Sequence, residues 1–424
     1  MNIAMVVGTF PTPTETWIPD QVVGLLARGH RVRLFASPPV EHQSPHPIVV
    51  QHHLLDRVIY HPPRPTPRWA RVPAQLARVA LGLHMGPRAL LASLDVRRHG
   101  YHAASGTITY PLLALLPALR RERFDIVHAH DALCGLAPAL LKGLGRLSAP
   151  LLVTLHGPDI NDPAIVRRSR GYPLLARHAD AFTAGSEYVK RRAERLGFAA
   201  GRIHVLPQSV RADDWSFLPR RPGPDGTVCL LCIGRLSPVK GVHLAIGAMA
   251  ALARDHPHLR LILAGDGPLR SELEALAVSL GVADRVEFLG MLTRDRLLPV
   301  LERAHILVHP GVQFPDGFGE AQGMVLLEAQ ACGLPVVTTT AGGIPESVRD
   351  GESAIVVPHS DQQALTNAID TLLRNPEHWP AMGRAGRELV ESRFSLDHMI
   401  DQLEALYARL ASAALSAVPN HSNP

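Results

Sequence analysis

Short apolar runs alternate with amphipathic segments along almost the whole chain, and this alternation limits the fold more than any other feature. Residues 3–7 are apolar, residues 17–28 have apolar positions at helical spacing, and residues 31–36 form the next apolar run. Apolar runs without polar alternation are typical of strands that are buried on both faces, as in parallel sheets. The pattern therefore predicts an α/β fold in which helices cover parallel sheets.

A stretch rich in proline and glycine, residues 207–227, divides the alternation into two series. We expect the remaining strands of the first series at residues 126–130, 151–155, 181–184 and 203–206. Strands of the second series are expected at residues 228–233, 259–264, 286–289, 306–309, 335–338 and 354–357. This order predicts two doubly wound, Rossmann-like domains, with residues 1–208 in the first and 209–394 in the second.

The chain after residue 394 is expected to leave the second domain. An amphipathic helix over residues 395–412 should pack back on the first domain, and residues 413–424 should be disordered because they are small, polar and proline-containing. In doubly wound folds, ligands bind at the carboxyl ends of the strands. We therefore expect the two domains to face a central cleft with these ends.

The charge of the chain is unevenly distributed. Residues 1–207 hold 25 Lys and Arg against 13 Asp and Glu, whereas residues 208–424 hold 18 against 25. A basic half suits an anionic substrate, a membrane surface or nucleic acid. Aromatic residues make up only 5% of the chain and no nucleic-acid-reading motif is present, so we expect no nucleic-acid partner.

Residues 61–101 do not fit the α/β alternation. They contain helical apolar spacing over residues 72–94 and a single acid, Asp95. Their arginines are Arg64, Arg68, Arg71, Arg78, Arg88, Arg97 and Arg98. One interpretation is a solvated helix packed on the domain; the other is docking of residues 64–98 to an anionic membrane or a lipid-linked acceptor.

The amino terminus lacks the charged segment of a secretory signal, and the longest apolar candidate, residues 108–119, is shorter than the ~18–20 residues of a membrane span. We expect a cytoplasmic protein, with peripheral contact to the inner membrane left open. Four cysteines are too few for a disulfide scaffold. Cys229 and Cys232 fall in one expected strand, where a spacing of three should point the two thiols to opposite faces.

Two glutamates at the start of an apolar helix are the strongest functional signal. Glu320 and Glu328 are eight residues apart and follow the glycine-containing segment 314–319. A helix that begins near Gln322 would present free backbone amides to an anion. Glu320 can bind sugar hydroxyls there, and Glu328 can accept hydrogen bonds from both hydroxyls of a ribose. Two solvated acids on a helix are the simpler alternative.

A cationic loop follows the first expected strand of the second domain. Its Arg235 can bind a phosphate with two nitrogens, and Lys240 adds a compact positive charge. The chain has only three lysines against 40 arginines, which weakly favours a specific role for Lys240. Ordinary loop cations are the alternative.

Several motifs together resemble the retaining GT-B glycosyltransferases of family 4. They are the segments 234–241, 263–268 and 286–290, the spaced glutamate pair, and the segment 332–337, in matching order over residues 228–390. The segments 10–18 and 154–159 resemble the branch that builds bacterial exopolysaccharides such as colanic acid.

The resemblance implies roles at the matching positions. Arg235 and Lys240 would bind the diphosphate of a nucleotide-sugar, Glu320 the sugar, and Glu328 the ribose. His156 would contact the transferred sugar near the reacting carbon. The donor would also meet the following residues: Gly8, Thr9, Leu289, Gly290, Gln322, Gly323 and Met324. One departure from the family pattern is Ala321, which stands where glycine is usual; a positive φ there would cost alanine about 1 kcal/mol.

Other residues of the first domain are expected near the acceptor. His128, His130, Asp131 and Asp159 are candidate acceptor ligands. His128 and His130 share one strand face, and with His156 they could form a metal triad. We instead expect no metal and no other cofactor, because no Asp-x-Asp motif is present and the cations can neutralise the diphosphate.

The expected function is transfer of a sugar from a nucleoside diphosphate to an acceptor hydroxyl, in the synthesis of exopolysaccharide or another cell-surface glycan. The acceptor would be a glycan or a lipid-linked molecule. Two alternatives stay open. One is a GT-B epimerase or phosphorylase, and the other is an inactive protein that binds nucleotide-sugars.

Overall fold

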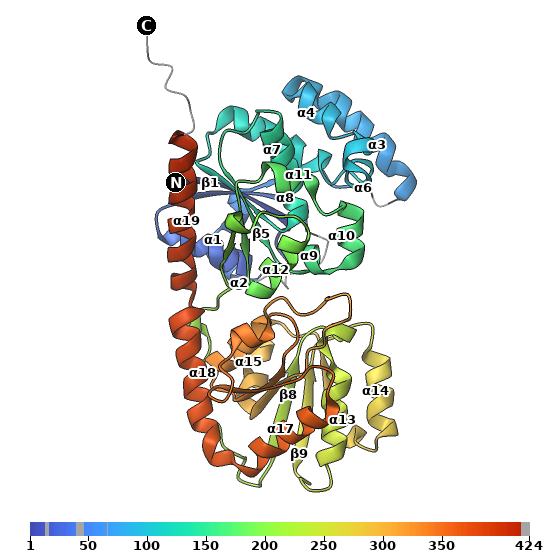
Figure 1. The fold of residues 1–424 in the computed structure, drawn as a ribbon, viewed down its shortest axis with the longest axis vertical. Helices are drawn as coiled ribbons and strands as arrows, with labels where there is room; N and C mark the ends of the chain where they lie inside the picture. Colours follow the sequence, from blue (N-terminus) through green and yellow to red (C-terminus); the bar gives the residue numbers. More distant parts are fainter. Residues whose placement is uncertain (13–16, 40–45, 66, 417–424) are drawn as a thin grey trace. The chain divides into compact units, whose positions relative to one another are not determined.

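The computed structural model describes residues 1–12, 17–39, 46–65 and 67–416, which divide into two compact units (Figure 1). The first unit holds residues 1–185, 189–206 and the chain from residue 400, and the second holds residues 186–188 and 207–399. The division near residue 207 falls within the proline- and glycine-rich stretch. Part of the segment 10–18 and the tail from residue 417 lie outside the described residues.

The first unit is built on a seven-stranded parallel sheet in the order β3-β2-β1-β4-β5-β6-β7. The strands are β1 (Asn2–Thr9), β2 (Arg31–Ser37), β3 (Val58–Tyr60), β4 (Ile126–His130), β5 (Leu151–Leu155), β6 (Ala181–Ala184) and β7 (Ile203–Val205). β3 was not expected from the sequence. It is a three-residue edge strand, too short for the apolar pattern to reveal.

Helices flank this sheet (Figure 1). They are α1 (Trp17–Ala27), α2 (Pro47–Gln51), α7 (Thr109–Arg121), α8 (Ala132–Gly143), α9 (Pro158–Asn161), α10 (Pro163–Ser169), α11 (Pro173–His178) and α12 (Glu187–Arg195). The central strands are buried on both faces because these helices cover them; all five residues of β4 are buried. The parallel sheet expected from the apolar runs is confirmed.

The segment predicted as one helix over residues 72–94 is broken. It forms α3 (Arg68–Gly82) and α4 (Pro87–Ala92), followed by the short helices α5 (Val96–His99) and α6 (Tyr101–Ala104). Gly86 and Pro87 separate α3 from α4, since proline has no amide for the preceding turn and suits the first position of a new helix. α3 and α4 lie at the outside of the first unit, beyond α6 and α7 (Figure 1).

The second unit is built on a six-stranded parallel sheet in the order β10-β9-β8-β11-β12-β13. Its strands are β8 (Val228–Ile233), β9 (Leu259–Ala264), β10 (Val286–Gly290), β11 (Ile306–His309), β12 (Val336–Thr339) and β13 (Ala354–Val357). Its helices are α13 (Val242–Leu252), α14 (Arg270–Ser279), α15 (Arg294–Arg303), α16 (Met324–Ala331), α17 (Gln362–Arg374) and α18 (Trp379–Arg393).

Two hydrophobic clusters pack on the opposite faces of this sheet. Cys232 belongs to the cluster with α13 and α17, whereas Cys229 belongs to the cluster with α16. Both thiols are free and buried. The expectation that they point to opposite faces is confirmed.

The final helix, α19 (Leu396–Ser416), belongs to the first unit from residue 400 onwards. It contacts that unit through Glu404, which pairs with Arg28 at 3.1 Å and with His30 at 2.6 Å. The helix ends at Ser416, so the predicted disorder is wrong for residues 413–416. Their sequence, Ala-Ala-Leu-Ser, continues a helix readily because alanine and leucine have high helix propensity. No helix of the described residues is long and apolar enough to span a membrane.

Candidate functional site

The predicted donor residues of the second unit gather at one edge of its sheet. β8 and β11 are neighbours in the sheet. The strand that follows β8, β9, lies on one side of this pair, and the strand that follows β11, β12, lies on the other side. Such a switch point is where doubly wound folds leave a crevice at the carboxyl ends of the strands. Arg235 and Lys240 follow β8, and the segment that holds Glu320 follows β11. The topology therefore brings both predicted motifs to this edge.

Lys240 and Glu320 form an ion pair. Lys240 Nζ donates to Glu320 Oε2 at 2.5 Å, and both side chains are mostly buried. Burial alone would raise the pKa of Glu320, but the Lys240 ammonium and its hydrogen bond hold that pKa below its usual value. Glu320 is therefore a carboxylate at neutral pH.

Gly241 fixes the position of Lys240. It has a φ of 62°, and a Cβ there would lie 2.0 Å from the carbonyl oxygen of Pro310. No other residue fits this close approach without moving the backbone. The turn that ends at Lys240 is therefore held against the chain that leaves β11.

His309, at the end of β11, is a site residue that the sequence analysis missed. Its side chain is buried, and Nε2 lies 3.8 Å from Glu320 Oε2 without a hydrogen-bond partner among the described residues. Burial and the nearby Lys240 ammonium lower the pKa of His309 to about 4. The imidazole is thus neutral beside the ion pair. Its only sequence signal was a histidine at the carboxyl end of an apolar strand.

Gly342 and Gly343 support the backbone of Glu320. The Gly343 amide donates to the Glu320 carbonyl oxygen at 2.9 Å, and a Cβ on Gly342 would lie 2.1 Å from the same oxygen. These glycines follow β12 and were also missed, although a glycine pair just after an expected strand is a visible signal. Ala321 does not have a positive φ, so it carries none of the strain that a left-handed backbone would impose.

Helix α16 begins at Met324, later than the predicted start near Gln322, because Gly323 is its N-cap with a φ of 88°. The Gln322 side chain exchanges two hydrogen bonds with the Gln208 backbone, at 2.8 and 3.0 Å. In the described part of the chain, no acceptor is recorded for the Gln322 and Gly323 amides. These amides precede the positive end of the helix dipole, which favours an anion.

Arg235 extends from the same edge. It is exposed, and its guanidinium has no hydrogen bond or ion pair to the residues that the structure describes. A free guanidinium in this place is available to a ligand with planar pairs of oxygen atoms. The two cations thus differ in their contacts: Lys240 is paired with Glu320, whereas the Arg235 guanidinium has no partner among the described residues.

Glu328 lies on the second turn of α16 and is partly buried. Its carboxylate makes no hydrogen bond or ion pair within the described residues. Burial raises the pKa of Glu328 to about 7, and Arg294 opposes this only in part, since Arg294 pairs with Asp214 at 2.9 Å. A partly buried acceptor without a partner is suited to a hydroxyl-bearing ligand.

The raised pKa of Glu328 gives a testable pH dependence. Between pH 4.5 and about 7 the folded protein holds a proton that the unfolded chain has released. The free energy of unfolding should therefore fall as pH rises through this window. The buried Asp159, whose pKa is also raised to about 7, contributes to the same fall. We therefore expect urea denaturation of Glu328→Gln to show a smaller fall than the parent, and the variant to be more stable than the parent at pH 8 by about 1–2 kcal/mol.

Glu272→Gln is the matched control, because Glu272 is exposed on α14. It should keep the pH profile of the parent. An identical profile in Glu328→Gln would show that Glu328 is not protonated in the folded protein near neutral pH.

Leu289 and Gly290 end β10 at the same edge of the sheet. The Gly290 carbonyl accepts from the Gly265 amide at 2.8 Å, so this part of the main chain is already paired with the segment after β9. Gly290 has a φ of 70°, which suits glycine. The predicted contact of this main chain with the base stays a prediction.

In the first unit, His128 is a packing residue. It is buried on β4, and its two ring nitrogens lie 2.7 Å from the Tyr407 hydroxyl and 2.6 Å from the Thr154 hydroxyl. Burial lowers the pKa of His128 to about 3. With both nitrogens occupied, His128 lies under the edge of the sheet and is not free to bind a metal or an acceptor.

His130 and His156 stack on each other. Nδ1 of His130 lies 3.0 Å from Nε2 of His156, and the rings are 5.2 Å apart. Trp17 packs against His156 with a ring separation of 5.8 Å. Burial lowers the pKa of His156 to about 4, so its ring is neutral. The predicted contact of His156 with the transferred sugar stays a prediction.

Asp131 and Asp159 hold the backbone of this region. Asp131 is the N-cap of α8 and accepts from the Cys134 amide at 2.9 Å. The buried Asp159 accepts from the Ala132 and Gly157 amides, both at 2.9 Å. Burial, together with the nearby Asp131 charge, raises the pKa of Asp159 to about 7. These contacts give both acids a structural role at positions predicted as acceptor ligands.

Gly8 and Thr9 end β1, next to β4 in the sheet, and open space surrounds the place where a Cβ of Gly8 would lie.

No group of three or more His, Cys, Asp or Glu among the described residues is arranged to hold a metal ion. Of the three histidines considered as a metal triad, His130 and His156 are hydrogen-bonded to each other and His128 to Tyr407 and Thr154. That the reaction needs no metal stays a prediction.

Two models of known protein families match the chain, one in each part. The sequence model of the group 1 glycosyl transferases matches residues 216–389, and that of Glycosyltransferase Family 4 matches residues 93–214. The first match covers the Lys240, Glu320 and Glu328 region.

Individual relatives of this chain are glycosyltransferases by name as well. A glycosyltransferase assigned to colanic acid biosynthesis in Escherichia coli K12 is 26% identical over 97% of this chain and 100% of that protein. A GDP-mannose-dependent phosphatidylinositol monomannoside mannosyltransferase of Mycolicibacterium smegmatis is 31% identical over 68% of this chain and 79% of that protein. The crystal structure of Anabaena HepE with UDP and glucose has a TM-score of 0.70 at 19% identity, covering 96% of this chain and all of HepE.

Proposed function

The chain belongs to the family 4 and group 1 glycosyltransferases, and we propose that it transfers a sugar, with retained anomeric configuration, from a nucleoside diphosphate to a hydroxyl of a cell-surface glycan. The observation that carries this proposal is the Lys240–Glu320 ion pair at the carboxyl edge of the second sheet. The unpaired Arg235 and the amides before α16 lie in the segments that follow the same two strands.

Each of these residues has a different role in the proposed reaction. Arg235 binds phosphate oxygens with its fork of donors, and the amides before α16 add donors without charge. Lys240 neutralises the charge that develops on the departing diphosphate. Glu320, held by Lys240, accepts from the hydroxyls of the sugar, while Glu328 accepts from the ribose. Donors fixed before the reaction stabilise the transition state without reorganisation.

The bond changes balance without a protein nucleophile. The bond between the anomeric carbon and the diphosphate oxygen breaks as the acceptor oxygen attacks from the same face. The acceptor proton passes to the departing phosphate. Glu320 is engaged by Lys240, which favours its role in binding over attack on the sugar. Proton NMR of the product in the first minutes of reaction tests this: the anomer of the donor is expected, and the opposite anomer would disprove retention.

The reaction should need no divalent metal, because Lys240, Arg235 and the amides supply the positive charge at the diphosphate. We expect initial rates in 5 mM EDTA to stay within about twofold of the untreated rate. A twofold change corresponds to ~0.4 kcal/mol in the activation free energy. Complete loss of activity that added Zn²⁺ or Mg²⁺ restores would contradict this expectation.

The acceptor class is supported by the relatives. The Escherichia coli relative is assigned to colanic acid synthesis, and the mycobacterial relative acts on a phosphatidylinositol mannoside. The first name concerns the synthesis of a glycan, colanic acid, and the second a mannoside attached to a lipid. A glycan or lipid-linked acceptor is therefore the class that we propose for this chain.

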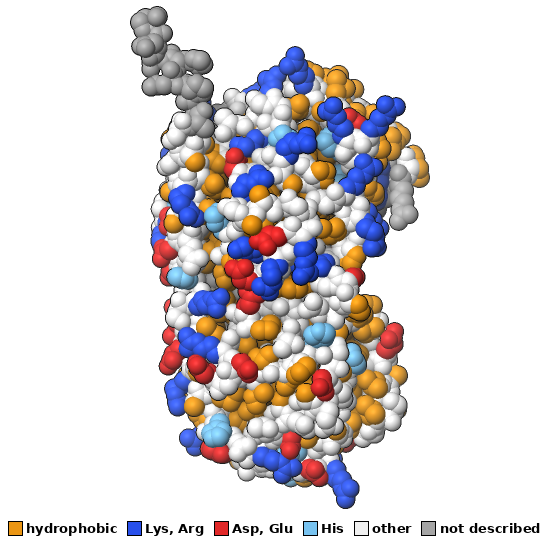
Figure 2. Space-filling view, in the orientation of Figure 1, with side chains coloured by type: hydrophobic (Ala, Val, Ile, Leu, Met, Phe, Trp, Pro, Cys, Tyr) orange, Lys and Arg blue, Asp and Glu red, His pale blue; other side chains and the backbone are white. Residues whose placement is uncertain are grey.

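We also propose that α3 attaches the protein to an anionic membrane. Trp69, Val72 and Leu76 recur at helical spacing and are 82, 54 and 51% exposed. Arg71 and Arg78 lie on the same helix. Figure 2 shows Lys and Arg side chains among hydrophobic ones over the part of the surface where Figure 1 places α3 and α4. Both arginines lie on the other side of α3, where Arg71 donates to the Pro65 carbonyl and Arg78 to the Pro63 carbonyl. The exposed apolar stripe, on a helix of a basic segment, favours an interfacial helix over a solvated one.

Vesicle flotation tests this attachment. The protein should float with vesicles that contain about 30% phosphatidylglycerol, and Trp69→Ser combined with Leu76→Ser should lower the bound fraction by about tenfold, as expected for two lost apolar anchors. Val278→Ser is the control, because Val278 is 68% exposed on α14. Equal flotation of parent and double variant would rule out α3 as the attachment.

A further inference from the structure

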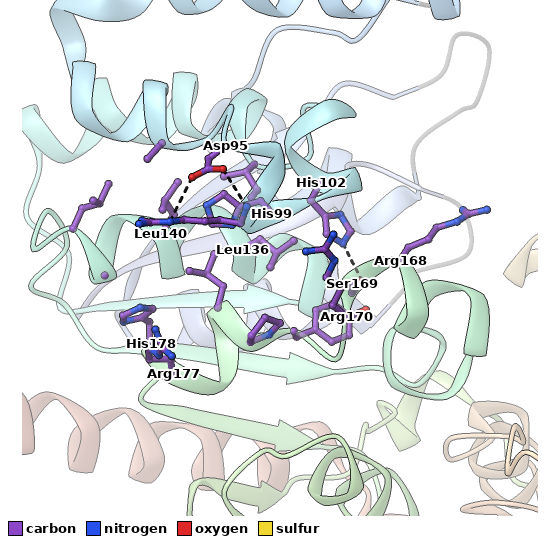
Figure 3. A pocket seen from close by; sticks show the side chains of 18 residues that line it. Asp95, His99, His102, Leu136, Leu140, Arg168, Ser169, Arg170, Arg177 and His178 are labelled. Atoms are coloured by element: carbon purple, nitrogen blue, oxygen red, sulfur yellow. Dashed lines mark hydrogen bonds and ion pairs between the residues drawn. The ribbon is translucent and has the colours of Figure 1, made fainter.

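A second candidate site lies within the first unit, between α8, α11 and the basic segment α4–α6. Side chains from these elements surround a pocket (Figure 3), and its volume is about 500 Å³. Every residue that lines it belongs to the first unit. The function proposed above uses none of them.

The rim of the pocket is strongly basic. Four arginines line it, Arg98, Arg168, Arg170 and Arg177, against a single acid, Asp95. Asp95 pairs with Arg98 at 3.4 Å. Arg168 lies over the Tyr101 ring, and Arg170 donates to the Arg97 carbonyl at 3.2 Å. These contacts leave most of the guanidinium donors unused, so the rim can bind an anion of more than one charge.

The floor of the pocket is apolar. Leu136 and Leu140 face it from α8, with Ile108 and Leu174 nearby, and Leu144 at the end of α8 is 39% exposed (Figure 3). A site for inorganic phosphate alone would not need this surface. Apolar area of this kind binds a hydrocarbon chain because both surfaces are removed from water.

A buried polar group completes the lining. His102, on α6, is only 6% exposed. Its Nε2 lies 3.0 Å from the Ser169 hydroxyl, and its Nδ1 has no partner among the described residues. A buried ring nitrogen without a partner is costly unless a ligand or water meets it. The basic rim, the apolar floor and this histidine together suit a ligand that has both an anionic group and an apolar chain.

We propose that this pocket binds a phosphate ester that carries an apolar chain, with the phosphate on the arginine rim and the chain along α8. The basic segment 61–101 thereby gains a second role, because α4–α6 form one wall of the pocket. The site is separate from the donor residues of the second unit. Its occupation can therefore be measured without any turnover of a nucleotide-sugar.

The test is titration calorimetry with decyl phosphate, kept below its critical micelle concentration. Three probes distinguish the parts of the ligand: decyl phosphate itself, inorganic phosphate, and pentaethylene glycol monodecyl ether, which has the same chain without the charge. Decyl phosphate should bind at least tenfold more tightly than either of the other two.

Variants locate the binding. Arg170→Gln with Arg177→Gln should weaken decyl phosphate at least tenfold, and Leu144→Ser should weaken it about threefold. Arg167→Gln is the matched control, since Arg167 is exposed on α10 but does not line the pocket. All of these variants should keep the nucleotide affinity of the parent, which separates this proposal from the donor site.

Three results would overturn the proposal. They are equal affinity for inorganic phosphate and decyl phosphate, no binding of decyl phosphate, and affinity that the double arginine variant leaves unchanged. The substituted positions other than Leu144 are exposed arginines, so unfolding of the variants is not expected.

Discussion

Replacing Lys240 with alanine should lower kcat by about 10²–10³-fold, the usual effect of removing one preorganised charge from a transition state. The ammonium is lost where the departing diphosphate gains charge. The same change leaves the mostly buried Glu320 carboxylate without its partner. An unpaired buried carboxylate takes up a proton more readily, so the pKa of Glu320 should rise and its sugar-binding role should weaken as well.

Lys142→Ala is the matched control for this result. Lys142 is buried to a similar degree and pairs with Asp180 at 2.8 Å, but it lies in the first unit. Its loss should leave kcat within about twofold of the parent. Lys240→Arg should recover only part of the activity, because a planar guanidinium does not replace a compact ammonium at this turn. If Lys240→Ala and Lys142→Ala had the same activity, the role of Lys240 would be wrong.

Glu328→Ala should weaken the binding of the nucleoside diphosphate by about 1.5–3 kcal/mol, or roughly 10–150-fold, because hydrogen bonds to a charged acceptor are worth this much. Truncation removes the acceptor that we assign to both ribose hydroxyls. Since the pKa of Glu328 is raised to about 7, affinity in the parent should also increase as pH rises through this value.

The 2′-deoxynucleotide gives the sharper form of this test. The parent should bind it about tenfold more weakly than the ribonucleotide, while Glu328→Ala should bind the two with equal affinity. Glu272→Ala, at an exposed position of α14, should discriminate like the parent. A variant that still distinguishes the two sugars would place the ribose elsewhere.

The positions of the strands other than β3 followed directly from the sequence, because a fully buried strand leaves a run of apolar residues with no alternation. β4, β5, β6, β8, β9, β11 and β13 have the predicted bounds. The approach of Lys240 to Glu320 was also foreseeable in outline, since parallel strands bring their carboxyl ends to one edge.

The remaining features depend on contacts between distant residues. His309 is an ordinary strand-terminal histidine in the sequence, and only the fold places it 3.8 Å from Glu320. The acids Asp131 and Asp159 were predicted to bind an acceptor, but their carboxylates accept from backbone amides. Capping and ligand binding demand the same residue types at the same loop ends, so sequence alone does not separate them.

The break between α3 and α4 has a local cause that was visible in the chain. The apolar spacing continues through Gly86-Pro87, and the prediction followed the spacing rather than the proline. The pocket beneath α4–α6 could not be foreseen, because its arginines come from segments 70 residues apart that only the fold brings together.

The central claim is that the second unit binds a nucleoside diphosphate through Lys240, Arg235 and the amides before α16. Titration calorimetry of the parent with UDP, GDP and ADP, and with the matching monophosphates, tests it most directly. We expect one diphosphate to bind at least tenfold more tightly than its monophosphate, a difference of about 1.4 kcal/mol, and Lys240→Ala to remove that difference. Equal affinity for the diphosphate and the monophosphate, or no binding of any nucleotide, would contradict the claim.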